Sequence, residues 1–184
     1  MRTLFAIALL ISCCLVSSSA IFQQSDVQRR AQEIAASFNK QKHKVKEKFG
    51  FREEMYKKVR GEPVIRQNIR AYSGVYEVTH LGYTMNLQVG SNGSVEASGF
   101  EPATDGTQPA RRFRVENGRV EGALLTGTKV YEDGATEKFE GVFMNRTEFS
   151  SPTDKGVTVF GLGVVGNPVE FAGNTYDKLF YGLK

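Results

Sequence analysis

The chain of 184 residues contains no tryptophan, two histidines and two cysteines. Both cysteines, Cys13 and Cys14, lie in the first 20 residues, so a chain cut after Ala20 has no thiol. Such a chain can form neither a disulfide nor a cysteine-based metal site, and its own apolar core must hold it together. The longest apolar run, residues 4–16, is shorter than the roughly 20 residues of a membrane-spanning helix.

The first 20 residues have the pattern of a secretory signal peptide. Arg2 supplies the positive start, residues 4–16 are mostly apolar, and residues 17–20 are small residues suited to cleavage. We therefore expect a secreted or periplasmic protein that is cleaved after Ala20. The alternatives are a lipoprotein modified at Cys13 and an uncleaved N-terminal anchor.

Charge divides the rest of the chain into two parts. Residues 21–70 contain 13 Lys and Arg against 6 Asp and Glu, whereas residues 71–184 contain 10 against 14. In the first part, apolar residues recur at spacings of four and three, which predicts helices over residues 25–48 and 51–60 with a hinge at Gly50. We interpret residues 21–70 as a basic helical arm and linker.

The arm is compatible with several partners. Its narrow apolar stripe favours packing on the rest of the chain or on a second copy, whereas Phe38, Phe49 and Phe51 among the lysines favour an anionic membrane surface. Residues 25–60 are therefore the candidate contact with a membrane or a protein partner. We expect no nucleic-acid binding, because the sequence contains no recognised nucleic-acid module.

Residues 71–184 have the pattern of an antiparallel β-domain. Apolar and polar residues alternate over residues 83–89, and Asn92-Gly93 then marks a hairpin turn. The same signal recurs at Asn117-Gly118 and Asp133-Gly134. With about eight or nine strands, the sequence predicts a mainly β fold, in which a small up-and-down barrel follows the helical arm. An open sheet curved around the N-terminal helix is the competing arrangement.

The signal peptide, the short strand meander and the glycine-based turns give an outline similar to that of calycin-type barrels such as lipocalins and avidins. Because the chain has no tryptophan, it lacks the lipocalin Gly-x-Trp signature and the avidin aromatic site. The interior of a barrel of this size is either filled by its own side chains or hollow enough for a small apolar ligand. The candidate lining residues are Tyr76, Tyr83, Met85, Leu87, Phe113, Phe139, Phe143 and Phe160.

No motif for catalysis, a cofactor or a metal stands out. His43 lies among the lysines of the arm, and His80 ends a predicted strand without a second metal ligand at a recognised spacing. Four acidic residues surround one predicted hairpin, where we expect them to face solvent: Glu132, Asp133, Glu137 and Glu140. We therefore predict no catalytic residue, no metal ligand and no cofactor.

The leading hypothesis is an exported, non-enzymatic protein that binds a small apolar molecule in its barrel. The alternative is a structural or interaction protein of the cell envelope that acts through the basic amphipathic arm. A third hypothesis is an enzyme with dispersed catalytic residues, built on His80 or on an acidic pair.

Overall fold

The computed structural model describes residues 26–39, 58–104, 108–149, 153, 155–171 and 174–184. The described residues form a helix over residues 26–38, a short 3₁₀ helix and a nine-stranded antiparallel sheet. In chain order, the elements after the helix are β1 (Lys58–Pro63), η1 (Ile69–Tyr72), β2 (Gly74–Val78), β3 (Tyr83–Val89), β4 (Ser94–Glu101), β5 (Arg111–Glu121), β6 (Leu124–Tyr131), β7 (Thr136–Phe149), β8 (Val157–Phe171) and β9 (Asn174–Leu183).

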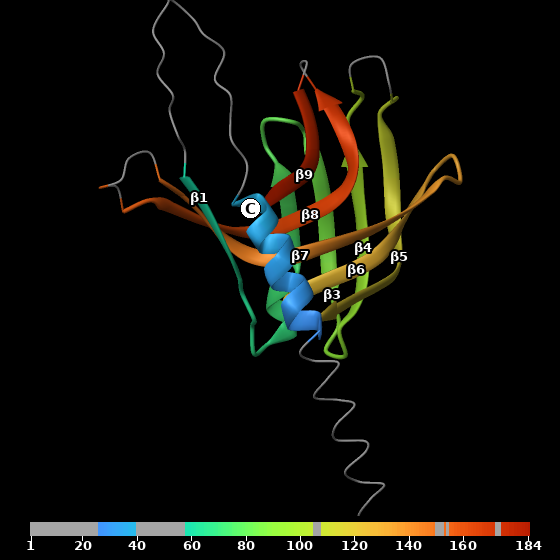
Figure 1. Ribbon diagram of the computed structural model, residues 1–184. Coiled ribbons are helices and arrows are strands. Elements are labelled where there is room, and N and C mark those ends of the chain that lie inside the picture. The colour runs from blue at the N-terminus through green and yellow to red at the C-terminus, as the bar shows by residue number, and fades with distance from the viewer. Residues whose placement is uncertain (1–25, 40–57, 105–107, 150–152, 154, 172–173) are drawn as a thin grey trace, which may run out of the picture.

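Strands β2 to β9 form a closed barrel in which each strand pairs with the next strand along the chain. The last strand then pairs with β2, where Tyr76 lies opposite Leu183, and this pairing closes the sheet. The predicted up-and-down barrel is therefore confirmed. The helix lies outside the barrel (Figure 1), so the competing arrangement of a sheet wrapped around the helix is wrong.

The alternation of apolar and polar residues decides which side chains fill the barrel. In β3 every second residue from Tyr83 to Val89 is buried, and the residues between them face outward. Because successive side chains of a strand point to opposite faces, each strand supplies one inward series. Buried side chains from all eight strands of the barrel join in one core cluster.

Two of the three predicted hairpin turns are confirmed. Asn92-Gly93 lies between β3 and β4, and Asp133-Gly134 lies between β6 and β7. The glycine has a positive φ in each turn, 82° at Gly93 and 85° at Gly134. Glycine adopts this left-handed conformation without the steric cost that a Cβ would bring.

The predicted hairpin at Asn117-Gly118 is wrong. Strand β5 continues through these residues, and the pairing with β6 shifts between Glu116 and Arg119, which makes them a β-bulge. Asn117 has a φ of 52°, a conformation that asparagine tolerates in bulges as well as in turns. The turn between β5 and β6 instead begins at Gly122, whose φ is 60°.

The helix over residues 26–38 packs across the outer wall of the barrel. Its buried residues recur at helical spacing and pack on outward-facing side chains of β6, β7 and the β5–β6 turn. Ala31, Ile34, Ala35 and Phe38 form one cluster with Ala123, Leu124, Val142 and Met144. Arg30 adds an exposed ion pair with Glu140, with 2.9 Å between Nε and the carboxylate. The middle of β7 is therefore buried on both of its faces.

The prediction of a helix over residues 51–60 is wrong for residues 58–60, the part of this range that the structure describes. Residues 58–60 belong to β1, which pairs with β7 and places Val59 opposite Glu148. Strand β6 pairs with β7 only as far as Val142, so the remaining edge of β7 is open to β1. Residues 40–57 of the predicted arm lie outside the described residues, and the division of the chain at residue 70 stays a prediction.

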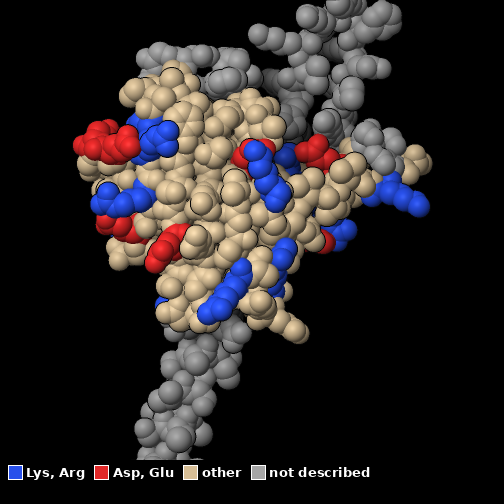
Figure 2. Space-filling model, turned by 180° about the vertical axis from the view of Figure 1, so that it is seen from behind, with Lys and Arg blue, Asp and Glu red and all other residues tan. Residues whose placement is uncertain are grey.

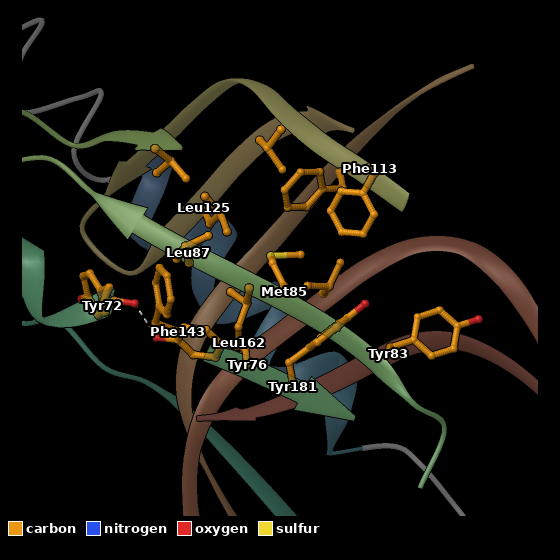
Figure 3. Close-up of a cluster of buried hydrophobic side chains, with 14 of the residues drawn as sticks. Tyr72, Tyr76, Tyr83, Met85, Leu87, Phe113, Leu125, Phe143, Leu162 and Tyr181 are labelled. Atoms are coloured by element: carbon orange, nitrogen blue, oxygen red, sulfur yellow. Dashed lines mark hydrogen bonds between the residues drawn. The ribbon is translucent and has the colours of Figure 1, made fainter. Parts of the chain in front are cut away.

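One end of the barrel, which we call the closed end, is covered by η1. The Tyr72 hydroxyl donates a hydrogen bond to the carbonyl of Val64 at 2.7 Å and accepts one from the Arg66 amide at 2.9 Å. Its ring stacks on Phe143 with 4.1 Å between centroids. Tyr76 donates to the Tyr72 carbonyl at 2.6 Å (Figure 3). These contacts satisfy the buried polar groups at this end and leave it packed.

Candidate functional site

The eight side chains predicted to line the barrel lie in its core or against it. Seven are buried, and Phe160 is half-buried beside them. They pack on one another: Phe143 lies 6.0 Å from Tyr76 and 6.4 Å from Phe160 between ring centroids. Figure 3 shows six of the eight among the side chains that fill the barrel: Tyr76, Tyr83, Met85, Leu87, Phe113 and Phe143. Their role in binding a ligand stays a prediction.

The opposite end of the barrel, which we call the mouth, contains a cavity of about 130 Å³. The connections β2–β3, β4–β5, β6–β7 and β8–β9 all lie at this end. Seven of the eight barrel strands contribute to the wall of this mouth cavity, and of the eight predicted residues only Tyr83 belongs to it. Its charged and phenolic lining residues are Tyr83, Glu101, Arg111, Lys129, Tyr131, Glu137, Tyr176, Asp177, Lys178 and Tyr181.

Glu101 is the centre of a charged network in the mouth. It accepts hydrogen bonds from Lys129 at 2.7 Å and from Arg111 at 3.0 Å. The side chains of Glu101 and Lys129 are only 10% and 7% exposed. Both cations also lie against aromatic rings, Arg111 at 3.8 Å from the centroid of Tyr131 and Lys129 at 5.2 Å from that of Phe113. A buried ion pair needs such additional partners, because removing charges from water is costly.

A second carboxylate, Glu137, lies on the other side of Tyr131. The Tyr131 hydroxyl donates to Glu137 at 2.7 Å and lies 3.2 Å from the nearer oxygen of Glu101. The backbone amide of Asn167 also donates to Glu137, at 3.2 Å. Burial first, and then the hydrogen bond to Glu137, hold the pKa of Tyr131 well above its ordinary value. Tyr131 therefore keeps its proton and acts as a donor between the two carboxylates.

Two further hydroxyls, those of Tyr83 and Tyr181, have no hydrogen bond to any described residue. Tyr181 is only 1% exposed and Tyr83 only 2%. Both side chains line the mouth cavity, and their hydroxyls point toward the same end of the barrel, away from Tyr72 (Figure 3). Among the described residues that line the cavity, Arg111 Nε is the fully buried side-chain atom without a hydrogen-bond partner, and the two hydroxyl oxygens keep some contact with the open space of the cavity. These polar groups can bond to a molecule held in the cavity.

The surroundings of these hydroxyls favour their neutral form. Burial first, followed by the charge of Glu101, raises the pKa of Tyr83 to about 12. Burial also holds the pKa of Tyr181 well above its ordinary value, and Glu101 and Glu137 act in the same direction. At neutral pH both phenols are therefore able to donate as well as accept a hydrogen bond.

Sequence reasoning missed most of this network. Glu101, Arg111 and Lys129 were not among the candidate residues, and Glu137, which was expected to face solvent, is half-buried and lines the mouth cavity. The alternation of the strands does contain a signal for these residues. Each charged residue lies two positions from an inward-facing residue of the same strand, so its side chain points inward as well. The pairs are Gly99 and Glu101, Arg111 and Phe113, Gly127 and Lys129, and Glu137 and Phe139.

The other candidate residues lie elsewhere. His80 is exposed in the connection between β2 and β3, and His43 is outside the described residues. Glu132 and Asp133 are exposed in the β6–β7 turn, and Glu140 pairs with Arg30 on the outer wall. In the described ranges, no group of three or more His, Cys, Asp or Glu side chains could hold a metal ion.

A larger hollow of about 460 Å³ lies on the outer surface of β2 to β6. Exposed polar side chains such as Asn86, Ser98 and Arg112 contribute to it, together with Phe100. On the face opposite the helix, acidic and basic side chains lie side by side at several places, with uncharged surface around them (Figure 2). Among the described residues that line this hollow, no fully buried polar atom lacks a partner, whereas Arg111 Nε does so at the mouth, and the mouth is therefore the stronger candidate site.

The fold and the site together define a closed eight-stranded antiparallel barrel with a helix on its outer wall and a charged cavity at one end. Comparisons with models of known protein families, with curated proteins and with solved structures found no significant match. Among the described residues, no helix combines the length and the apolar character needed to span a bilayer.

Proposed function

We propose that the protein is an exported, non-enzymatic binding protein that holds a small polar molecule in the mouth cavity. The observation that carries this proposal is the pair of tyrosine hydroxyls of Tyr83 and Tyr181, which line the cavity without a hydrogen-bond partner among the described residues, although little of either side chain is exposed. Export is supported by the pattern of residues 1–20, which has the charged start and apolar run of a signal peptide.

The polar class of the ligand follows from the packing of the interior. An apolar ligand would need space between aromatic side chains that already contact one another, such as Phe143 and Tyr76. The space at the mouth is instead lined by carboxylates, cations and phenols. Such groups bind a molecule that returns hydrogen bonds to them, because an apolar occupant would leave them without partners.

The size of the ligand follows from the volume of the cavity. Pockets for drug-sized molecules measure roughly 300–1,000 Å³, whereas a cavity of roughly 150 Å³ holds benzene. At about 130 Å³, the mouth cavity fits a molecule of similar size, or one end of a longer molecule that extends out of the barrel. The ion pairs of Glu101 hold the wall in place before binding, which lowers the entropic cost of binding.

The helical arm supports the alternative of a membrane or protein contact less directly. The apolar residues of the helix over residues 26–38 pack on the barrel itself, where Ile34 and Phe38 are buried. A contact with a membrane or another protein through residues 25–60 would therefore rest on the exposed positions of the helix or on residues outside the described part of the chain.

Native mass spectrometry of the protein purified gently from its own source tests the proposal. We expect a small polar molecule that leaves on denaturation, binds again to the emptied protein, and binds more weakly to the Tyr83→Phe and Tyr181→Phe variants. Tyr76→Phe is the matched control, because that hydroxyl lies at the closed end and donates to Tyr72. A ligand that binds all four proteins equally, or no ligand in a broad fragment screen followed by NMR, would contradict the proposal.

A further inference from the structure

We infer that the mouth cavity selects a small organic cation, such as a primary ammonium compound, with Glu137 as its counter-ion. This inference rests on the proposed function and adds the charge of the ligand to it. Glu137, the tyrosine rings and the two unpartnered hydroxyls surround the same cavity.

The first argument is the pairing of charges around the cavity. Three cationic side chains line it, and each has a carboxylate partner: Lys129 and Arg111 share Glu101, and Lys178 bonds to Asp177 at 2.6 Å. Glu137 is different, because its partners are the neutral donors Tyr131 and Asn167. Among the described residues it has no ion pair, so a bound cation would complete the pairing.

The second argument is the aromatic wall of the cavity. The rings of Tyr83, Tyr131, Tyr176 and Tyr181 line it, and aromatic faces attract cations. The protein already uses this interaction at the mouth, where Arg111 lies 3.8 Å from the Tyr131 centroid. Lys129 likewise lies 5.7 Å from the centroid of Phe139. A ligand cation would meet the same kind of surroundings as these two side chains.

The third argument is the sign of the field at the two unpartnered hydroxyls, where burial and then the charges of Glu101 and Glu137 raise the pKa of both tyrosines and Arg111 acts in the opposite direction on Tyr83. Beyond burial, every charge that influences the pKa of Tyr181 raises it, and the charges of Glu101 and Glu137 are among them. Negative charge on a group at this place is therefore unfavourable, and positive charge is favourable. The oxygens of Tyr83 and Tyr181 can accept hydrogen bonds from the N–H groups of an ammonium ion.

Three probes of nearly equal size and shape test the charge of the ligand directly. They are benzylammonium, benzyl alcohol and benzoate, titrated separately into the full chain at neutral pH and constant ionic strength. We expect benzylammonium to bind at least about ten-fold more tightly than either of the others, because it alone pairs with Glu137. NMR shifts of Tyr83 and Tyr181 during the titration place the probe in the mouth cavity.

The Glu137→Gln variant tests the counter-ion, because it keeps the shape of the side chain and removes its charge. We expect it to lose at least about ten-fold in affinity for benzylammonium and little for benzyl alcohol. Glu132→Gln is the matched control, since Glu132 is exposed in the adjoining turn and does not line the mouth cavity. The three-probe comparison on the unaltered protein needs no variant, so it decides the inference even where Glu137→Gln folds poorly.

The outcomes separate this inference from the proposed function. If benzyl alcohol or benzoate binds at the mouth as tightly as benzylammonium, the selection of a cation is wrong while a binding site at the mouth remains. Equal affinity of the Glu137→Gln and Glu132→Gln variants for benzylammonium would also overturn it. If none of the three probes binds, the cation inference fails, and the proposed function is then judged by its own native ligand and fragment screen.

Discussion

Lys129 donates a hydrogen bond to Glu101 at 2.7 Å inside the barrel, although the two residues come from β6 and β4, and β5 lies between those strands. The register places Lys129 opposite Glu137 on the neighbouring strand, yet its side chain reaches across the interior to Glu101. The pair thus bridges β4 and β6 past β5 and places two buried charges in the wall of the mouth cavity.

Replacement of Lys129 by methionine tests how strongly this pair holds the mouth. We expect Lys129→Met to lower the free energy of unfolding by about 3 kcal/mol, because it leaves the buried Glu101 with Arg111 as its one cationic partner among the described residues. Urea denaturation measures the change. The control is Lys138→Met, on the exposed face of β7, where we expect a change within about 0.5 kcal/mol.

The double variant Glu101→Met/Lys129→Met distinguishes an ion pair from two independent contacts. We expect its loss of stability to be smaller than the sum of the two single losses, because the second replacement removes a charge that the first has left unpaired. Strictly additive losses would contradict the pairing of these residues.

Much of the barrel could be predicted from the sequence, because alternation and turn residues both act locally. The inward series of β3 follows from period-two alternation, and Asn92-Gly93 is a turn as expected. The prediction at Asn117-Gly118 failed for a physical reason. The positive φ that makes Asn-Gly common in hairpin turns is also what a β-bulge needs, and only the pairing of β5 with both neighbours separates the two cases.

Asn117 is therefore expected to matter through its backbone conformation. We expect Asn117→Val to cost about 1–2 kcal/mol of stability, because a β-branched residue is strained at a φ of 52°. Asn117→Gly should change stability little, since glycine adopts this conformation freely. Arg114→Val is the matched control on the exposed face of the same strand. Thermal or urea unfolding checks the series, and equal effects of the two valine variants would refute the argument.

The site was harder to predict than the fold, because its residues are charged and the sequence gives no contact between strands. A charged residue at an inward-facing position, such as Lys129, can lie at a solvent-exposed strand end or in a buried network of charges. Only the register of four strands brings Glu101, Arg111 and Glu137 to the same end. A charged residue at an inward-facing position of a strand was the available signal in the sequence. It indicates a buried network only when a partner of opposite charge is known to lie on another strand.

The raised pKa of Tyr83 predicts how stability changes at high pH. Tyr83 in the folded protein has a pKa of about 12, compared with 10.0 in its ordinary state. Between these values, the unfolded chain loses the proton while the folded chain keeps it, so the free energy of unfolding falls as pH rises from 10 to 12. We expect this fall to be smaller in Tyr83→Phe, which has no proton to lose at this position.

Urea denaturation of both proteins over this pH range measures the difference. Below the ordinary tyrosine pKa, the stability of the unaltered protein and of Tyr83→Phe should change in parallel with pH, because the Tyr83 phenol is then protonated in both the folded and the unfolded chain. An identical fall with pH in both proteins would show that Tyr83 ionises normally and that its surroundings at the mouth are not as described.

The helix prediction succeeded where packing on the barrel agrees with the sequence pattern. Helical spacing places Ile34 and Phe38 on one side of the helix, and that side is buried. The same stripe continues to Val59, which instead lies in β1, because the free edge of β7 offers it backbone partners. Local periodicity does not contain that information, since the edge is formed by residues more than 80 positions away.

Gly163 provides the final prediction, because the helix depends on its lack of a side chain. A Cβ at Gly163 would lie 2.9 Å from the ring of Phe38 and 2.9 Å from the terminal methyl of Met144, closer than real contacts allow. We expect Gly163→Ala to cost about 1–3 kcal/mol and to speed hydrogen exchange over residues 26–38, as the helix shifts on the wall. In a Phe38→Ala background the same change should cost less, because the ring that it meets is gone. Gly182→Ala is the control, since its Cβ would find its nearest atom at 3.7 Å, an ordinary contact. Equal stability and equal exchange of the two glycine variants would contradict a helix seated on Gly163.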